Sequence, residues 1–294
     1  MKGVYLVPDR DVVRCRYCRT LWPEAGHEVD DERSLRRAIE RDELTLRYQP
    51  VVVLPEGQVI GTEALVRWCH PVRGLLAPDD FVPLAEETGL VVPMGTWVVR
   101  AACRQAAEWH RSFPDRSLFV SVNVATEQLD LQFPAAVADA LAAADLPPHL
   151  LWLEITKSGL IEDFASLRPC LEELKGLGVK LALDDFGTGY SSLSDVTNLP
   201  VDILKMDRGL VDEIGDNPRT ATLVASIFDM AHALDLVAMT AGVETRQQLT
   251  ELLRHGCDLA QGHLWSPPLP ANEVTAILRR GEPLTDPAAI LLTA

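Results

Sequence analysis

From about residue 33 onward, short apolar runs alternate with longer stretches of helical periodicity, and this alternation limits the possible fold more than any other feature of the chain. The apolar runs have the length and composition of buried strands, and most are followed by an amphipathic stretch. Strands that alternate with helices are typical of a parallel sheet covered by helices. The apolar runs span residues 44–53, 59–68, 118–124, 150–156, 179–185, 201–207 and 236–244.

The length of the alternating region favours a closed barrel. A TIM-type barrel has about 250 residues, and no linker rich in Gly, Ser or Pro interrupts residues 33–280. No Gly-x-Gly-x-x-Gly follows the first strand, which disfavours a dinucleotide-binding fold. We therefore predict an α/β fold with one barrel domain at 33–280, an N-terminal extension at 1–32 and a C-terminal tail at 281–294.

The N-terminal extension contains Cys15 and Cys18 in a Cys-x-x-Cys pair. Such a pair is half of a zinc ribbon, and His27 could be a third ligand, but the sequence has no second Cys-x-x-Cys. We interpret the extension as a loose segment with two incidental thiols. A metal or redox role is the alternative.

The charge of the chain excludes some classes of partner. Lys and Arg number 27 and Asp and Glu number 43, which gives a net charge of −16. A chain this acidic has no overall positive electrostatic potential that would attract duplex DNA or an anionic membrane. An anionic ligand therefore needs cationic groups in its own binding site. No apolar run approaches the roughly 18 residues of a membrane span. We expect a cytoplasmic protein with reduced core cysteines.

Polar residues mark the ends of the predicted strands. Because the carboxyl ends of barrel strands meet on one face, we expect these side chains to converge there. One acid at a strand end is usually a helix cap, and Asp207 could cap a helix that starts at Arg208. Several acids together repel each other unless cations lie between them. The residues are Glu63, Asn123, Glu154, Asp184, Asp185, Lys205, Asp207 and Glu244.

Oxygen ligands of this kind suit Mg²⁺, Mn²⁺ or Ca²⁺. A pair of such ions can support phosphodiester cleavage, and a nearby lysine can neutralise a phosphate oxygen. The Gly-rich loop that follows Asp185 is a candidate lid. The sequence therefore predicts a divalent-metal site at the strand ends.

A series of short motifs runs through about residues 33–275. The motifs are Tyr48-Gln-Pro, Glu63-Ala-Leu-Val-Arg67, Ser121-Val-Asn123, Glu154-Ile-Thr156, the string DDFGTGYSS at 184–192, Leu204-Lys-Met-Asp207, Gly242-Val-Glu244, Gln261-Gly262 and Pro268-Leu-Pro270. In sequence and order they resemble those of the EAL domain family, bacterial phosphodiesterases for cyclic di-GMP. The resemblance implies a modified TIM (β/α)8 barrel whose first strand is antiparallel, and a homodimer formed around the Gly-rich loop.

The resemblance also implies a role for each matching residue, with Mg²⁺ or Mn²⁺ as cofactor and hydrolysis of cyclic di-GMP to linear pGpG as the reaction. The first metal ion falls to Glu63, Asn123, Glu154 and Asp184, and the second to Asp184 and Asp185. The positions matched to catalytic residues are Lys205, Asp185 and Glu244. The positions matched to substrate contacts are Gln49, Leu65, Arg67, Gln261 and Pro268.

Two positions depart from the family pattern. Ala241 stands where the family has a glutamate that binds the second metal, and Lys157 stands where the family has a glutamate that steadies the Gly-rich loop. Alanine cannot coordinate a metal, and lysine offers only donors. Our hypothesis is therefore a domain that binds cyclic di-GMP and hydrolyses it slowly. The alternatives are a fully active phosphodiesterase, a protein-interaction scaffold and another metal-dependent barrel hydrolase.

Overall fold

A computed structural model of the chain describes residues 12–14, 21–23, 32–156, 164–187 and 197–284. The predicted features at Cys15, Cys18, His27, Lys157 and 188–192 lie outside these ranges. No helix in the described ranges has both the length and the apolar character of a membrane span. The strands are β1 Val12–Arg14, β2 Leu21–Pro23, β3 Leu44–Val53, β4 Gln58–His70, β5 Gly74–Leu76, β6 Phe119–Val124, β7 Leu151–Thr156, β8 Lys180–Phe186, β9 Ile203–Met206, β10 Val237–Thr240 and β11 Leu259–Ala260. The α-helices are α1 Glu32–Glu40, α2 Val82–Glu87, α3 Val91–Ser112, α4 Phe133–Ala144, α6 Phe164–Leu177, α8 Arg208–Glu213, α9 Pro218–Ala233, α10 Arg246–Arg254 and α11 Ala271–Arg280. Three 3-10 turns join them: η1 Pro78–Asp80, η2 Thr126–Gln128 and η3 Pro148–Leu150.

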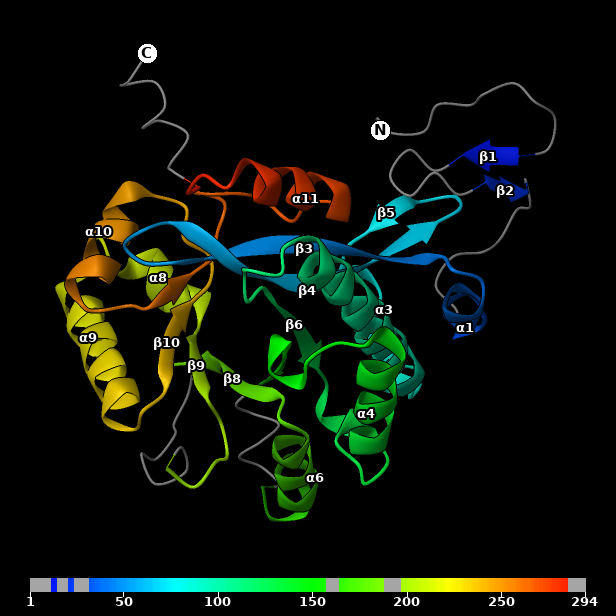
Figure 1. Cartoon of the computed structure of the whole chain (residues 1–294), viewed down its shortest axis with the longest axis horizontal. Helices are drawn as coiled ribbons and strands as arrows, with labels where there is room; N and C mark the ends of the chain where they lie inside the picture. The colour runs from blue at the N-terminus through cyan, green and yellow to red at the C-terminus, as the bar shows by residue number, and fades with distance from the viewer. Residues whose placement is uncertain (1–11, 15–20, 24–31, 157–163, 188–196, 285–294) are drawn as a thin grey trace.

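The main sheet closes into a barrel (Figure 1). From β4 the neighbours run parallel in the order β6, β7, β8, β9, β10 and β11. The first barrel strand, β3, pairs antiparallel with both β4 and β11 and closes the ring. The predicted barrel with an antiparallel first strand is confirmed.

The lower interior of the barrel is apolar. Val51, Phe119, Ile203 and Met239 form a buried cluster there, and the Phe119 ring stacks on Trp152 with centroids 3.6 Å apart. Gly61 makes room for Phe119, because a Cβ at that position would lie 2.4 Å from the ring. The polar residues near the carboxyl ends of the strands therefore lie above a layer of buried apolar side chains.

The outer faces of the strands pack against the surrounding helices (Figure 1). Alternating residues of β3, such as Tyr48 and Val52, point outward into this core, and Tyr48 meets Trp109 of α3 edge to face at 5.0 Å. Trp68 is also buried, and its indole N–H donates to Glu43 at 3.1 Å. The cysteines in the described ranges are buried and unbridged.

One ion-pair network ties the start of β9 to its neighbours. The Asp202 carboxylate accepts from Lys175 of α6 at 2.5 Å and from Lys180 of β8 at 2.9 Å, and also from the Leu181 amide at 3.0 Å. Burial would raise the pKa of Asp202, but these donors outweigh burial and hold the pKa below its usual value. The network therefore stabilises the register between β8 and β9.

The sequence pattern and the structure differ mainly at the end of the barrel. β10 ends at Thr240, four residues before the predicted end, because the chain turns at Gly242, whose φ is +79°. The two-residue strand β11 and the short strand β5 were not predicted. Asp207 is the predicted helix cap. It directly precedes α8, and its carboxylate accepts a hydrogen bond from the Gly209 amide at 2.7 Å.

Candidate functional site

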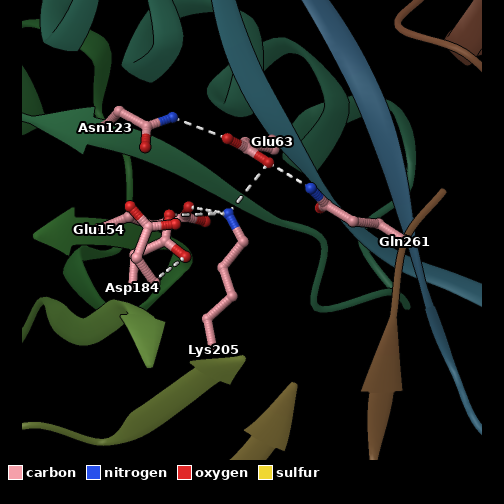
Figure 2. A network of polar contacts seen from close by, with 7 residues as sticks. Glu63, Asn123, Glu154, Asp184, Lys205 and Gln261 are labelled. Atoms are coloured by element: carbon pink, nitrogen blue, oxygen red, sulfur yellow. Dashed lines mark hydrogen bonds and ion pairs between the residues drawn. The ribbon is translucent and has the colours of Figure 1, made fainter. Parts of the chain in front are cut away.

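Consecutive barrel strands bring the predicted polar residues to one mouth. Asn123 of β6 pairs in register with Glu154 of β7, and Asp184 of β8 pairs with Thr156, near the carboxyl ends of these strands. Glu63 of the neighbouring strand β4 pairs in register with Ser121 of β6. Figure 2 shows the side chains of Glu63, Glu154 and Asp184 pointing toward one another. The predicted convergence is present.

Lys205 of β9 lies at the centre of this cluster (Figure 2). Its Nζ is 3.2 Å from Glu63 Oε2 and 3.2 Å from Asp184 Oδ2, and it also pairs closely with Glu154 Oε2. The lysine is only 3% exposed and Glu154 only 1%. One buried ammonium therefore faces three buried carboxylates that come from three different strands.

Two amides fix the orientation of Glu63. Asn123 Nδ2 donates to Glu63 Oε1 at 2.7 Å, and Gln261 Nε2 donates to Glu63 Oε2. Gln261 follows β11 directly, so the last strand of the barrel contributes to the site. The carboxylate is held from both sides before any ligand binds.

Burial and like charge dominate the electrostatics of the cluster. Burial and the Glu63 carboxylate raise the pKa of Glu154 to about 8. Burial would also raise the pKa of Glu63, but the Lys205 ammonium and the two amide donors outweigh it and lower that pKa. Burial would lower the pKa of Lys205, but its three carboxylate partners hold it well above the ordinary lysine value. The cluster therefore carries more negative charge than its lysine balances.

The chemistry of the cluster fits a divalent cation. Glu154 Oε1 is buried and has no hydrogen-bond partner in the described part of the chain. The converging donors are all oxygens, which Mg²⁺ and Mn²⁺ prefer. Within residues 32–156, 164–187 and 197–284 no three acidic, His or Cys side chains form a ready-made chelate, because Lys205 lies between the carboxylates. The residues fit a metal ion once the lysine ammonium withdraws.

Asp185 lies beside this cluster but outside its ion pairs with Lys205. Its backbone is left-handed, with φ at +57°, and its amide donates to Asp184 Oδ1 at 2.8 Å. Burial and the neighbouring Asp184 charge raise its pKa. The side chain is exposed, so it is placed to meet a ligand from the solvent side.

The predicted substrate contacts surround the same mouth. Gln49 of β3 lies opposite Glu63 in register and donates to the Ser266 carbonyl at 3.2 Å. Leu65 and Arg67 follow on the same face of β4, because side chains alternate along a strand. Pro268 precedes Leu269, which bridges to Tyr48 of β3. The five predicted substrate contacts, Gln261 included, thus lie on β3, β4 and the chain after β11.

A protein-family model for the EAL domain matches residues 32–268. The chain belongs to the EAL domain family. Cyclic di-GMP phosphodiesterase NbdA of Pseudomonas aeruginosa is 41% identical over 264 residues, which cover 90% of this chain and 34% of that protein. The bifunctional diguanylate cyclase/cyclic di-GMP phosphodiesterase MucR of the same species is 41% identical over 279 residues, 91% of this chain and 39% of MucR. The chain thus spans well under half the length of these curated relatives.

Solved EAL structures have the same fold. The PaMucR phosphodiesterase in complex with c-di-GMP aligns with a TM-score of 0.78 at 41% identity and covers 82% of this chain and 98% of that one. The EAL domain of Mycobacterium smegmatis DcpA aligns with a TM-score of 0.68 at 34% identity, with the same coverage of each chain. The predicted family membership is confirmed.

Ala241 and Lys157 are the two positions predicted to depart from the family pattern. Ala241 directly follows β10 and is half-buried at the rim, where its methyl group offers no ligand. Glu244 lies farther out, is exposed, and pairs with Arg208 at 2.7 Å. The structure does not bring Glu244 into the Lys205 cluster. Lys157 lies outside the described residues.

A cavity opens beside the cluster. Its volume is about 390 Å³, and its walls are mostly apolar side chains of β4 and α3, among them Leu65, Met94 and Val98. Asn123 and Glu154 also line it, so the cavity communicates with the acidic cluster. Apolar walls with a few polar groups are typical of small-molecule sites.

The sequence analysis did not single out Arg47 or Ser266. Arg47 is two residues before Gln49, so the alternation of β3 could have placed it in the mouth. Ser266 contributes a backbone carbonyl, for which no sequence pattern exists.

Gly262 is expected to be essential for the placement of Gln261. A Cβ at Gly262 would lie 2.0 Å from the Val243 carbonyl oxygen, and that backbone is fixed by pairing with Gln261 and Leu264. We expect G262A to cost at least about 2 kcal/mol of unfolding free energy, measured by urea denaturation. The matched control is G176A in α6, where an added Cβ meets nothing within 4 Å. We expect G176A to increase the free energy of unfolding by about 0.5–1 kcal/mol. Equal stability of G262A and the unmodified chain would contradict the fixed contact.

Proposed function

We propose that this chain binds cyclic di-GMP in the mouth of its barrel with the help of Mg²⁺ or Mn²⁺, and hydrolyses it slowly to linear pGpG. The observation that carries the proposal is the buried cluster of three carboxylates around Lys205. Support also comes from relatives that are cyclic di-GMP phosphodiesterases and from a related phosphodiesterase solved with c-di-GMP.

In this proposal the first metal ion is bound by Glu63, Asn123, Glu154 and Asp184, of which Glu63, Glu154 and Asp184 surround Lys205. A divalent cation bound there would polarise the scissile phosphodiester and activate water. Lys205 would keep its proton throughout, because the remaining carboxylates hold its pKa high, and would neutralise a phosphate oxygen. Gln261 and Asn123 would keep Glu63 in place during the reaction.

The residues proposed for substrate recognition lie around this reacting end, and Gln261 belongs to both. Gln49, Leu65, Arg67, Gln261 and Pro268 surround the mouth, and the cavity beside Leu65 has room for a planar base. These groups need no second metal ion. Binding should therefore survive where hydrolysis is impaired.

The reason for slow hydrolysis is the second metal position. Asp184 and Asp185 remain there, but Ala241 removes a carboxylate of the family pattern. Loss of one group that stabilises the transition state costs about 10²–10³ in rate. The proposal therefore separates affinity, which is retained, from turnover, which is reduced.

The test measures both quantities on one preparation. Purified protein is titrated with cyclic di-GMP by calorimetry, and pGpG formation is followed by chromatography with and without Mn²⁺. We expect saturable binding and turnover well below about 1 s⁻¹, the low end of typical enzyme rates.

Other outcomes would select among the alternatives. Turnover at or above about 1 s⁻¹ would establish a fully active phosphodiesterase. An absence of binding heat would favour the protein-interaction scaffold. Hydrolysis of other phosphodiesters in preference to cyclic di-GMP would favour a different metal-dependent hydrolase.

The homodimer, which the family resemblance implies, and the cytoplasmic location, which follows from the apolar runs and cysteines of the sequence, stay predictions. Light scattering coupled to gel filtration measures the first, and fractionation of cells that express the chain measures the second. A monomer at micromolar concentration would contradict the predicted homodimer.

A further inference from the structure

Arg47 lies in the mouth of the barrel although no family motif includes it. In the antiparallel pair of β3 and β4, Gln49 lies opposite Glu63 and Arg47 lies opposite Leu65. Directly opposite residues share a face of the sheet. Arg47 therefore projects on the same side as Gln49 and Glu63, one step nearer the open end.

Arg47 is a buried charge, with only 8% of its surface exposed. A second arginine, Arg67, lies diagonally across the pair, because Thr45 is its direct partner. Burial lowers the pKa of Arg67, and the Arg47 charge lowers it further, so the two guanidinium groups act on each other. Arg67 itself is half-buried, and the Asp79 and Glu63 carboxylates act on its pKa in the opposite direction.

Charge is therefore segregated within the mouth. The carboxylates of Glu63, Glu154 and Asp184 surround Lys205, whereas Arg47 of β3 and Arg67 of β4 lie farther along this pair of strands, toward the open end. The whole chain has a net charge of −16, so this local cationic side is a specific feature and not part of a general positive field. An anion that enters the mouth meets a metal-binding side and an arginine side.

The proposed ligand has two phosphodiester groups, and only one can react at the acidic cluster. We propose that Arg47, together with Arg67, binds the second, uncleaved phosphate of cyclic di-GMP. This inference rests on the proposed function and adds a substrate-binding residue to it. Arginine suits the task because its planar fork donates two parallel hydrogen bonds to phosphate.

A ligand with a single phosphodiester provides the sharpest test. Calorimetry compares cyclic di-GMP with linear GpG, which lacks the second phosphate, on the unmodified chain and on R47M and R47K. For R47M we expect cyclic di-GMP to bind about 10–100-fold more weakly, while binding of GpG changes less than about threefold. R47K keeps the charge but loses the fork, so its loss should be intermediate. R100M changes an exposed arginine of α3 and should leave both affinities unchanged.

The comparison separates three failures. Equal weakening of both ligands by R47M would show that Arg47 only supports the fold, and unchanged affinity for both would exclude it from the site. Either result overturns the proposal for Arg47 but does not contradict the proposed function, because the unmodified chain still binds cyclic di-GMP. No binding to the unmodified chain would overturn the proposed function and this inference together. If R47M does not fold, R47K decides, because its loss must be confined to cyclic di-GMP.

Discussion

Replacing Lys205 with methionine is expected to destabilise the domain strongly and to abolish turnover. The substitution leaves Glu63, Glu154 and Asp184 buried without their central cation. Removing one partner of a buried ion pair costs about 3–5 kcal/mol. For a domain of this size that lowers the melting temperature by about 6–15 °C, measured by scanning calorimetry.

The loss of stability in K205M should depend on pH. Glu154 already has its pKa raised to about 8 by burial and by Glu63, and removal of the ammonium raises it further. A carboxyl group with a raised pKa in the folded state is most favourable when protonated, so stability falls as pH rises through that pKa. We expect K205M to melt much lower at pH 8.5 than at pH 6, and Mn²⁺ to restore part of the difference by binding the folded state.

The matched control for K205M is K180M. Lys180 pairs with Asp202, but its side chain is 44% exposed and Lys175 still serves the same carboxylate. Exposed ion pairs contribute less than about 1 kcal/mol. If K205M and K180M were equally stable at pH 8.5, Lys205 would not be the counter-charge of the cluster.

Restoring a carboxylate at position 241 is expected to increase hydrolysis by about 10²–10³-fold. Ala241 directly follows β10 at the rim, and A241E would add an oxygen ligand at the end of the barrel where Asp184 and Asp185 lie at the end of β8. The measurement is kcat for pGpG formation in Mn²⁺, together with the number of Mn²⁺ ions bound. We expect one more ion per chain in A241E.

The control for A241E is A241Q, which has the same size and shape but no negative charge. It should leave both the rate and the metal count unchanged, since a neutral amide is a much weaker ligand for a hard cation. Equal rates for A241E and the unmodified chain would show that the missing carboxylate does not limit hydrolysis. A241E combined with K157E then measures the contribution of the second departure.

The barrel strands could be predicted because most are fully buried runs of apolar residues. β3 spans the predicted residues 44–53, and β6, β7 and β8 agree within one residue at each end. β11 could not be found, because a strand of two residues has no periodicity and depends on pairing with β10 and β3. Tertiary pairing decides such short strands.

The site was predictable to the level of its residues but not of its contacts. Their positions at the ends of predicted strands placed Glu63, Glu154 and Asp184 in one mouth, and the structure brings them together. The position of Lys205 between them depends on side-chain geometry, which a sequence pattern does not contain. Glu244 shows the reverse case: it matches a motif, yet the turn at Gly242 takes it out to Arg208.

The closure of the barrel through β11 has a consequence for how the site assembles. Leu259 and Ala260 pair with Val53 and Val52, segments at opposite ends of the domain, and Gln261 comes next. During synthesis the sheet must stay open until residue 261 has left the ribosome, since contacts between distant segments form last. The contact between Gln261 and Glu63 therefore forms together with the pairing of β3 and β11, and a ligand bound near Gln261 should slow hydrogen exchange of the Val52 and Val53 amides.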